Sequence, residues 1–323
     1  MTMLCRLVAI AASFALVAAA ASAQIPADKP IRIVIPYPPG ASADMSSRLI
    51  GQKVEELGGP KVIVESRPGG GGTVAAMTVK TAPAEPISLF LADVGSFGVN
   101  QTLLPDQPFD REKDFKPVAS LYEFPSVLMV PTILPANNVA ELVALAKKTP
   151  GGLSYASQAV GAGGHLLGAM FANAIGTPMV HVPYRGAAAA VADVAAGNVT
   201  FIFVSFASAQ AQYANKTVKF LGVASPKRAA VLPDVPTMAE TGYPEVLLDA
   251  WFGVVAQSSM PDATVNALNA LFTRAARDPA VVERLASQGI AVRTGTPAEF
   301  GALIKSDGER LGRIVKALDI KAN

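Results

Sequence analysis

Short apolar, β-branched runs alternate with longer stretches of helical spacing along most of the chain. Ile31–Ile35 is such a run, and it stops at Pro36–Gly40, where backbone donors are lost and the chain must turn. Apolar side chains then recur at helical spacing from Met45 to Val54. Strands that alternate with helices form βαβ units. The pattern therefore predicts an α/β protein with mostly parallel sheets flanked by helices.

The alternation stops and starts again near Pro125, which indicates two α/β halves. Further strands are expected at residues 62–64, 87–91, 126–130, 153–156, 179–182, 200–204 and 220–224. Further helices are expected at residues 73–81, 139–147, 262–277, 279–288 and 297–318. Ligands of open α/β sheets sit beyond the carboxyl ends of strands, and a cleft between two halves is a preferred site for small molecules.

The first 23 residues have a pattern of their own. Arg6 gives a positive start, Leu7–Ala21 is apolar apart from Ser13, and Ala21-Ser22-Ala23 is a small-residue cleavage pattern. The apolar run is shorter than the roughly 20 residues that a membrane-spanning helix needs. We interpret residues 1–23 as a secretory signal peptide cleaved near Ala23, with an uncleaved anchor as the alternative.

The composition excludes several classes of protein. The chain is 51% hydrophobic and 16% charged, unlike a disordered chain. It has 27 Lys and Arg against 25 Asp and Glu with no basic run, which argues against nucleic-acid binding. Cys5 is the only cysteine and precedes the cleavage site, so no disulfide, thiolate metal site or cysteine nucleophile is expected after export.

Two small-residue loops are candidate anion sites. Gly40 and Ala41 precede a helix, where open N–H groups and the helix dipole favour a carboxylate; an ordinary stiff turn is the alternative. Gly161–Gly164 repeats this composition in the second half. Neither loop carries a phosphate-binding motif. The same holds for Gly69–Gly72, which we interpret as a flexible connection.

For each side chain that could have a functional role, a purely structural role is the alternative. His165 and His181 are the only histidines, and without a G-x-S-x-G motif or clustered ligands we expect core or capping roles. Asp93 follows an expected strand and either caps a helix or pairs with an amine of a ligand. Arg185 either faces an acidic ligand or is solvated. We expect no cofactor, no metal site and no catalytic residue.

Four segments, in order and at matching spacing, give the sequence a family resemblance. Lys29–Asp44, Val64–Gly72, His181–Gly186 and Leu232–Thr237 resemble hallmarks of the Bug-type proteins, the periplasmic solute receptors of tripartite tricarboxylate transporters. The resemblance implies a two-domain periplasmic-binding-protein (Venus flytrap) fold, with residues 24–125 and 248–323 in one domain and 126–247 in the other.

The resemblance also implies a function. It implies a periplasmic, monomeric receptor that is not an enzyme. The receptor would capture a small organic acid (a dicarboxylate, an aromatic carboxylate or an amino acid) and deliver it to membrane permease subunits. A secreted hydrolase using a serine with His165, and a ligand-loaded sensor partner of a signalling kinase, are the alternatives.

Site residues are transferred position by position from the matching motifs. They lie in the loop after the first strand, in the loop from Ser157, and at the ends of later strands. The ligand-binding set is Tyr37, Pro39, Gly40, Ala41, Ser42, Asp44, Asp93, Ser157, Gln158, Val160, Gly161, Ala162, His165, Arg185, Ser205 and Phe206.

The chain departs from the family pattern at four places. Ala41 stands where the family often has a second glycine, and Glu85-Pro86-Ile87 replaces the usual Asp-Gly-Tyr. Ala92-Asp93 replaces Gly-Thr or Gly-Ser, and Phe203-Val204-Ser205 replaces Phe-Asp-Asn. An acid is gained at one cleft position and lost at another. We hypothesise that Asp93 takes over amine binding from the missing acid.

Overall fold

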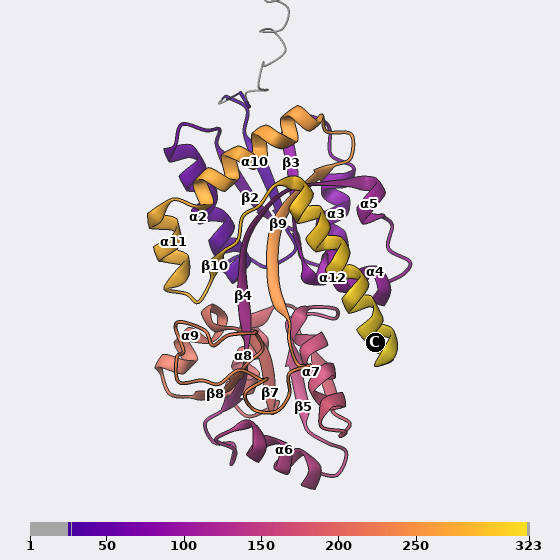
Figure 1. The fold of residues 1–323 in the computed structure, drawn as a ribbon, viewed down its shortest axis with the longest axis vertical. Helices are drawn as coiled ribbons and strands as arrows, with labels where there is room; N and C mark the ends of the chain where they lie inside the picture. The colour runs from indigo at the N-terminus through magenta and orange to yellow at the C-terminus, as the bar shows by residue number, and fades with distance from the viewer. Residues whose placement is uncertain (1–24, 27, 322–323) are drawn as a thin grey trace, which may run out of the picture.

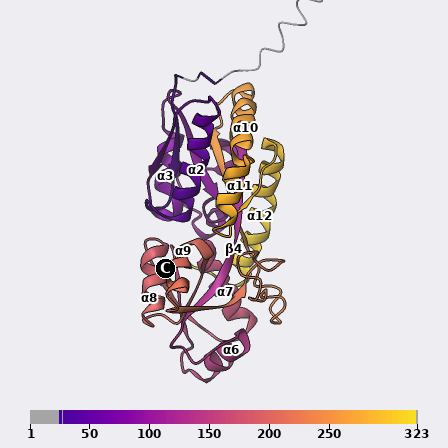
Figure 2. The same cartoon turned by 90° about the vertical axis from the view of Figure 1, so that its left-hand side faces the viewer.

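Two lobes lie one above the other and are connected by long strands in the computed structural model (Figure 1). The structure describes residues 25–26 and 28–321, so the predicted signal peptide lies outside the described residues. Among those residues, every helix is too short or too polar to cross a membrane. The turned view shows the helices of each lobe covering its sheet (Figure 2).

The first lobe is built on a sheet with the strand order β2-β1-β3-β9-β4, and β10 lies beside β4. Its strands are β1 (Ile31–Ile35), β2 (Val62–Ser66), β3 (Ile87–Asp93), β4 (Phe115–Pro131), β9 (Asp249–Gln257) and β10 (Ala291–Val292). Its helices are α2 (Ser42–Glu56), α3 (Thr73–Lys80), α4 (Asn100–Leu103), α5 (Arg111–Asp114), α10 (Asp262–Ala276), α11 (Pro279–Ala286) and α12 (Pro297–Ala317). A single 3-10 turn, η2 (Gly70–Gly72), precedes α3, and a π-helix, η3 (Val94–Val99), follows β3.

The second lobe uses the far end of β4 with four further strands. They are β5 (Ser154–Ser157), β6 (Val180–Pro183), β7 (Phe201–Ser205) and β8 (Val218–Val223). The helices are α6 (Val139–Lys148), α7 (Gly163–Ala174), α8 (Ala187–Ala195) and α9 (Phe206–Ala214). β5 is parallel to both β6 and β7, whereas β4 is antiparallel to β7 and β8.

The predicted two-domain α/β fold is confirmed, with one addition to the expected sheets. The outer strands pair in parallel, as expected. β9 and the first part of β4 were not predicted, and they add antiparallel pairs at the centre. Pro117 and Pro125 argue against a strand because proline donates no ladder hydrogen bond. The register of β4 shifts just after Pro117, so the chain accommodates that residue at an irregularity.

β4 is shared by the two lobes. It pairs with β9 as far as Pro125 opposite Asp249, and it pairs with β7 from Ser126 opposite Ser205. Trp251 in β9 is fully buried, and its Nε1 donates to Asp307 of α12 at 2.7 Å. The last helix is thus fixed to the strand that runs toward the second lobe.

Candidate ligand-binding site

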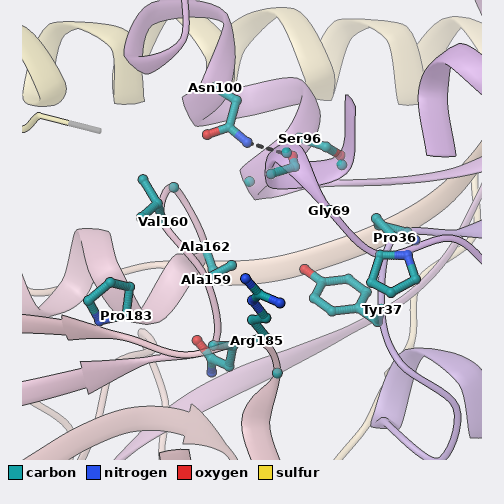
Figure 3. A pocket seen from close by; sticks show the side chains of 18 of the residues that line it. Pro36, Tyr37, Gly69, Ser96, Asn100, Ala159, Val160, Ala162, Pro183 and Arg185 are labelled. Carbon is teal, nitrogen blue, oxygen red and sulfur yellow. Dashed lines mark hydrogen bonds between the residues drawn. The ribbon is translucent and has the colours of Figure 1, made fainter. Parts of the chain in front are cut away.

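A cavity of about 700 Å³ lies between the lobes, within the usual range for small-molecule sites (Figure 3). Its walls come from segments that follow β1, β2, β3, β5 and β6, so it lies beyond the carboxyl ends of parallel strands, where α/β sheets bind ligands. It is lined by Pro36, Tyr37, Pro38, Pro68, Gly69, Gly70, Gly71, Gly72, Asp93, Gly95, Ser96, Asn100, Leu104, Gln158, Ala159, Val160, Gly161, Ala162, Pro183, Tyr184, Arg185 and Gly186.

The lobes touch each other beside this cavity. The Ser42 hydroxyl at the start of α2 lies 3.1 Å from the Ser205 hydroxyl and 3.2 Å from that of Ser208, both in the second lobe. At a second point, a Cβ built on Gly161 would lie 1.9 Å from Oδ1 of Asn100. The contact at Gly161 therefore depends on the absence of a side chain.

The glycine run Gly69–Gly72 forms part of the wall, and its last two residues are closely packed. All four residues have positive φ, between 56° and 133°, which favours glycine. A Cβ on Gly72 would lie 2.9 Å from that of Ser96, and Asn100 Nδ2 donates to the Gly71 carbonyl at 2.7 Å. Gly71 and Gly72 thus approach Asn100 and Ser96 too closely for a side chain, whereas Gly69 and Gly70 are exposed, and the interpretation of the run as a flexible connection stays a prediction.

Asp93 lies on the cavity wall and also caps η3. Its Oδ1 accepts from the Ser96 amide at 2.7 Å, and the Ser96 hydroxyl lies 3.1 Å from the same atom. The predicted capping role is thus confirmed, and the ligand role stays a prediction. Burial raises the pKa of the Asp93 carboxyl, while hydrogen bonds from Ser96, Tyr37 and Gly95 oppose the rise. Burial, and then the nearby Asp93 charge, raise the pKa of Tyr37.

The two histidines stack behind the loop that follows β5. Their ring centroids are 3.8 Å apart with an angle of 4° between the planes. His165 Nδ1 accepts from the Gly161 amide at 3.1 Å, and His181 Nε2 lies 2.7 Å from the Ser157 hydroxyl. Burial lowers the pKa of each to about 4, and for His165 the neighbouring His181 contributes as well. Both rings are therefore neutral near pH 7, and they support the loop through hydrogen bonds, as expected for capping histidines.

The N–H groups of the first loop have partners inside the loop. The Gly40 amide donates to Asp44 Oδ2 at 2.9 Å, and the Ala41 amide faces the Pro38 carbonyl at 3.3 Å. Asp44 also pairs with Arg48 at 2.9 Å. The expectation that Gly40 and Ala41 leave open donors is therefore corrected, because Asp44 folds back from the first turn of α2.

The structure divides the predicted site residues into two groups. Those that line the cavity are Tyr37, Asp93, Gln158, Val160, Gly161, Ala162 and Arg185. Those that do not line the cavity are Pro39, Gly40, Ala41, Ser42, Asp44, Ser157, His165, Ser205 and Phe206. In the second group, Phe206 packs against Phe220 with centroids 6.0 Å apart, and His165 is 4% exposed.

Several lining residues were missed from the sequence. The largest group is Pro68–Gly72, whose glycine content was a signal for close backbone approach. Ser96 and Asn100 have no local signal, because only the turn of η3 brings them to the cavity. Within the described part of the chain, no group of three His, Cys, Asp or Glu side chains could hold a metal ion.

Comparison with known proteins identifies the family. Residues 47–320 match the family model of the tripartite tricarboxylate transporter family receptor. A curated relative is the UPF0065 protein in the tcbD-tcbE intergenic region of Pseudomonas sp. strain P51, which is 36% identical over 91% of this chain and 88% of its own length.

Solved structures agree with this match. A structure described as a periplasmic transporter is 35% identical, with a TM-score of 0.85 over 91% of this chain and 99% of its own. R. palustris Rpa4515 with adipate is 27% identical, with a TM-score of 0.86 over 90% and 97% of the two chains. The chain belongs to the tripartite tricarboxylate transporter receptor family, so the predicted membership of the Bug-type solute receptors is confirmed. Its members are periplasmic solute-binding proteins.

Proposed function

We propose that this protein is a periplasmic receptor that captures a small organic carboxylate between its lobes and delivers it to membrane permease subunits. The observation that carries the proposal is the cavity of about 700 Å³ that both lobes line at their strand ends. The adipate of Rpa4515 shows that a similar chain binds a small dicarboxylate. We further propose that residues 1–23 are removed on export.

Capture follows from the way the lobes are connected. We propose that residues 24–125 with 248–323 move against residues 126–247, by bending where β4 passes from β9 to β7. A ligand held by both lobes binds the closed arrangement better than the open one, so it shifts the population toward closure. Gly161 and Arg185 contact such a ligand from the second lobe, and Tyr37 and Asp93 contact it from the first.

We propose binding without catalysis. The Ser157 hydroxyl and His181 Nε2 are 2.7 Å apart, as in a nucleophile–base pair. However, Ser157 is fully buried, and its hydroxyl also donates to the Ala159 carbonyl at 2.9 Å. Its proton therefore stays on the loop, and the pair supports the cavity wall.

The test is a thermal-shift screen of organic acids with the purified mature protein. A ligand at 100 times its Kd adds about 2.7 kcal/mol of stability. We expect at least one acid to raise the melting temperature, and to reduce the radius of gyration in small-angle scattering. Turnover of an ester or amide that is lost in His165→Ala would support the hydrolase alternative as the sequence predicts it, and loss in His181→Ala would instead support one built on Ser157 and His181. A flat response to the whole panel would exclude carboxylate capture.

A further inference from the structure

The cavity carries one negative and one positive side chain, and they belong to different lobes. Among the lining residues that the structure describes, only Asp93 and Arg185 are charged. Asp93 ends β3 and is 2% exposed, whereas Arg185 follows β6 and is exposed. The Arg185 side chain points across the cavity toward Tyr37, the neighbour of Asp93 (Figure 3). The cavity therefore has a negative side chain in the first lobe and a positive side chain in the second.

The capping role of Asp93 does not require a negatively charged side chain. Ser205 occupies the corresponding place at the end of β7, and its neutral hydroxyl accepts from the Ser208 amide at 3.3 Å. A hydroxyl thus suffices to cap a helix after a strand in this fold. The Asp93 carboxyl accepts from the Ser96 amide at 2.7 Å and lies 3.1 Å from the Ser96 hydroxyl, and within the described part of the chain no Lys, Arg or His forms an ion pair with it. A buried carboxylate without a cation is costly, so its presence here requires a reason outside the cap.

We propose that the cavity selects zwitterionic carboxylates, amino-acid-like ligands whose ammonium group pairs with Asp93 while a carboxylate faces Arg185. This inference rests on the proposed function, carboxylate capture, and specifies the class of ligand. A ligand ammonium supplies the cation that the Asp93 carboxylate lacks, in a site from which closure removes water. A plain dicarboxylate instead brings a like charge toward Asp93.

The test uses ligand pairs that differ only in the ammonium group. The probes are glutamate with glutarate and aspartate with succinate, measured by calorimetry on the mature protein at pH 7.5. We expect the amino member of at least one pair to bind ten- to a hundredfold more tightly, the range for a charge-assisted hydrogen bond. This comparison needs no variant, so it does not depend on the folding of a mutant.

Asp93→Asn assigns the preference to one carboxylate. It keeps the size of the side chain and an oxygen for the Ser96 amide, so the cap is retained. We expect it to weaken the amino member by at least tenfold and to leave the plain diacid unchanged or tighter. Asp93→Ser, with a neutral cap like that of Ser205, should behave in the same way. The matched control is Asp110→Asn: Asp110 caps α5, accepting from the Glu112 amide at 2.9 Å, and does not line the cavity.

The outcomes separate this inference from the function on which it rests. If plain diacids bind as tightly as amino acids, carboxylate capture stands and the selection by Asp93 is refuted. If both members of a pair weaken equally in Asp93→Asn, the residue is structural and the proposal fails. If diacids bind only below pH 6, Asp93 acts as a protonated donor, which also contradicts it. If no acid of either kind binds to folded protein, both proposals fall.

Discussion

Replacing Gly161 with alanine tests whether the lobes must touch to hold a ligand. Gly161 has φ of +77°, and its new Cβ would lie 1.9 Å from Oδ1, 2.9 Å from Cγ and 3.2 Å from Nδ2 of Asn100 in the other lobe. Contacts under 3.0 Å are essentially never seen for a real Cβ. Either the Asn100 side chain rotates and loses its hydrogen bond to the Gly71 carbonyl, or the loop and the facing lobe move apart by about 1 Å, a distance that takes hydrogen bonds out of range.

The substitution has two separable costs. Left-handed backbone costs a residue with a side chain roughly 1–2 kcal/mol, which lowers the free energy of unfolding. The clash acts on closure, and we expect ligand affinity to fall at least tenfold, since a misplacement of about 1 Å is costly at a preorganised site. Gly176→Ala is the matched control, because Gly176 has φ of +63° and nothing within 4 Å of the added Cβ.

Calorimetry and scattering distinguish the two costs. We expect Gly176→Ala to lose stability but keep full affinity for the tightest acid of the panel, and Gly161→Ala to lose both. Asn100→Ala removes all three atoms that the new Cβ meets, so the double variant should regain most of the affinity and the ligand-induced compaction. Wild-type affinity in Gly161→Ala, or equal losses in the two single variants, would refute the reasoning.

Three further predictions concern the same cavity. Because the pKa of His165 falls from 6.5 to about 4 on folding, its stability contribution is complete above pH 6.5, and about 3 kcal/mol of it is lost as the pH falls to 4. His181 titrates over the same range, so denaturant titrations of the native protein and of His165→Gln should differ in their pH-dependent loss by the part that His165 contributes. Ser42→Ala removes the hydroxyl contacts with Ser205 and Ser208, so calorimetry should find the Kd raised about fivefold with the melting temperature nearly unchanged; an unchanged Kd would argue against closure at this point. Arg185→Gln should weaken carboxylates about tenfold while Arg185→Lys retains part of the affinity, and equal values for the two variants would mean that charge is not what the residue supplies.

Local pattern predicts the outer strands well and the shared central strands poorly. Ile31–Ile35 and Thr200–Val204 are apolar runs bounded by turn residues, and both form strands at about the expected positions. The first part of β4 carries Pro117, and β9 contains Trp251 in a segment for which no strand was expected. Their strand conformation depends on pairing between residues more than 100 positions apart, such as Glu123 with Trp251, which a local window does not contain.

The sequence predicted the parts of the cavity that are formed by loops after strands. It did not predict the parts whose position depends on side-chain packing. Tyr37 and Gly161 belong to loops whose position after a strand follows from the α/β pattern. The stacking of His165 on His181 joins a helix to a strand, and the partner of Gly40 is a carboxylate on the next helix. Such contacts depend on side-chain directions in three dimensions, and no spacing in the sequence encodes them.

Two departures from the family pattern, at positions 93 and 204, bear on the charges that line the cavity. Much of the cavity wall consists of glycine, proline and alanine. These residues offer mainly backbone groups, which do not distinguish one acid from another. Among the lining residues that the structure describes, Asp93 and Arg185 alone carry charge, so we propose that discrimination between acids depends chiefly on these two side chains. Val204, where the family resemblance leads us to expect an acid, is fully buried and does not line the cavity, whereas Asp93 in the first lobe does line it. Because Asp93 and Arg185 line the cavity from opposite lobes, a zwitterion that paired with both, as we propose, would be held by both lobes, and selecting that ligand would be coupled to closing the lobes.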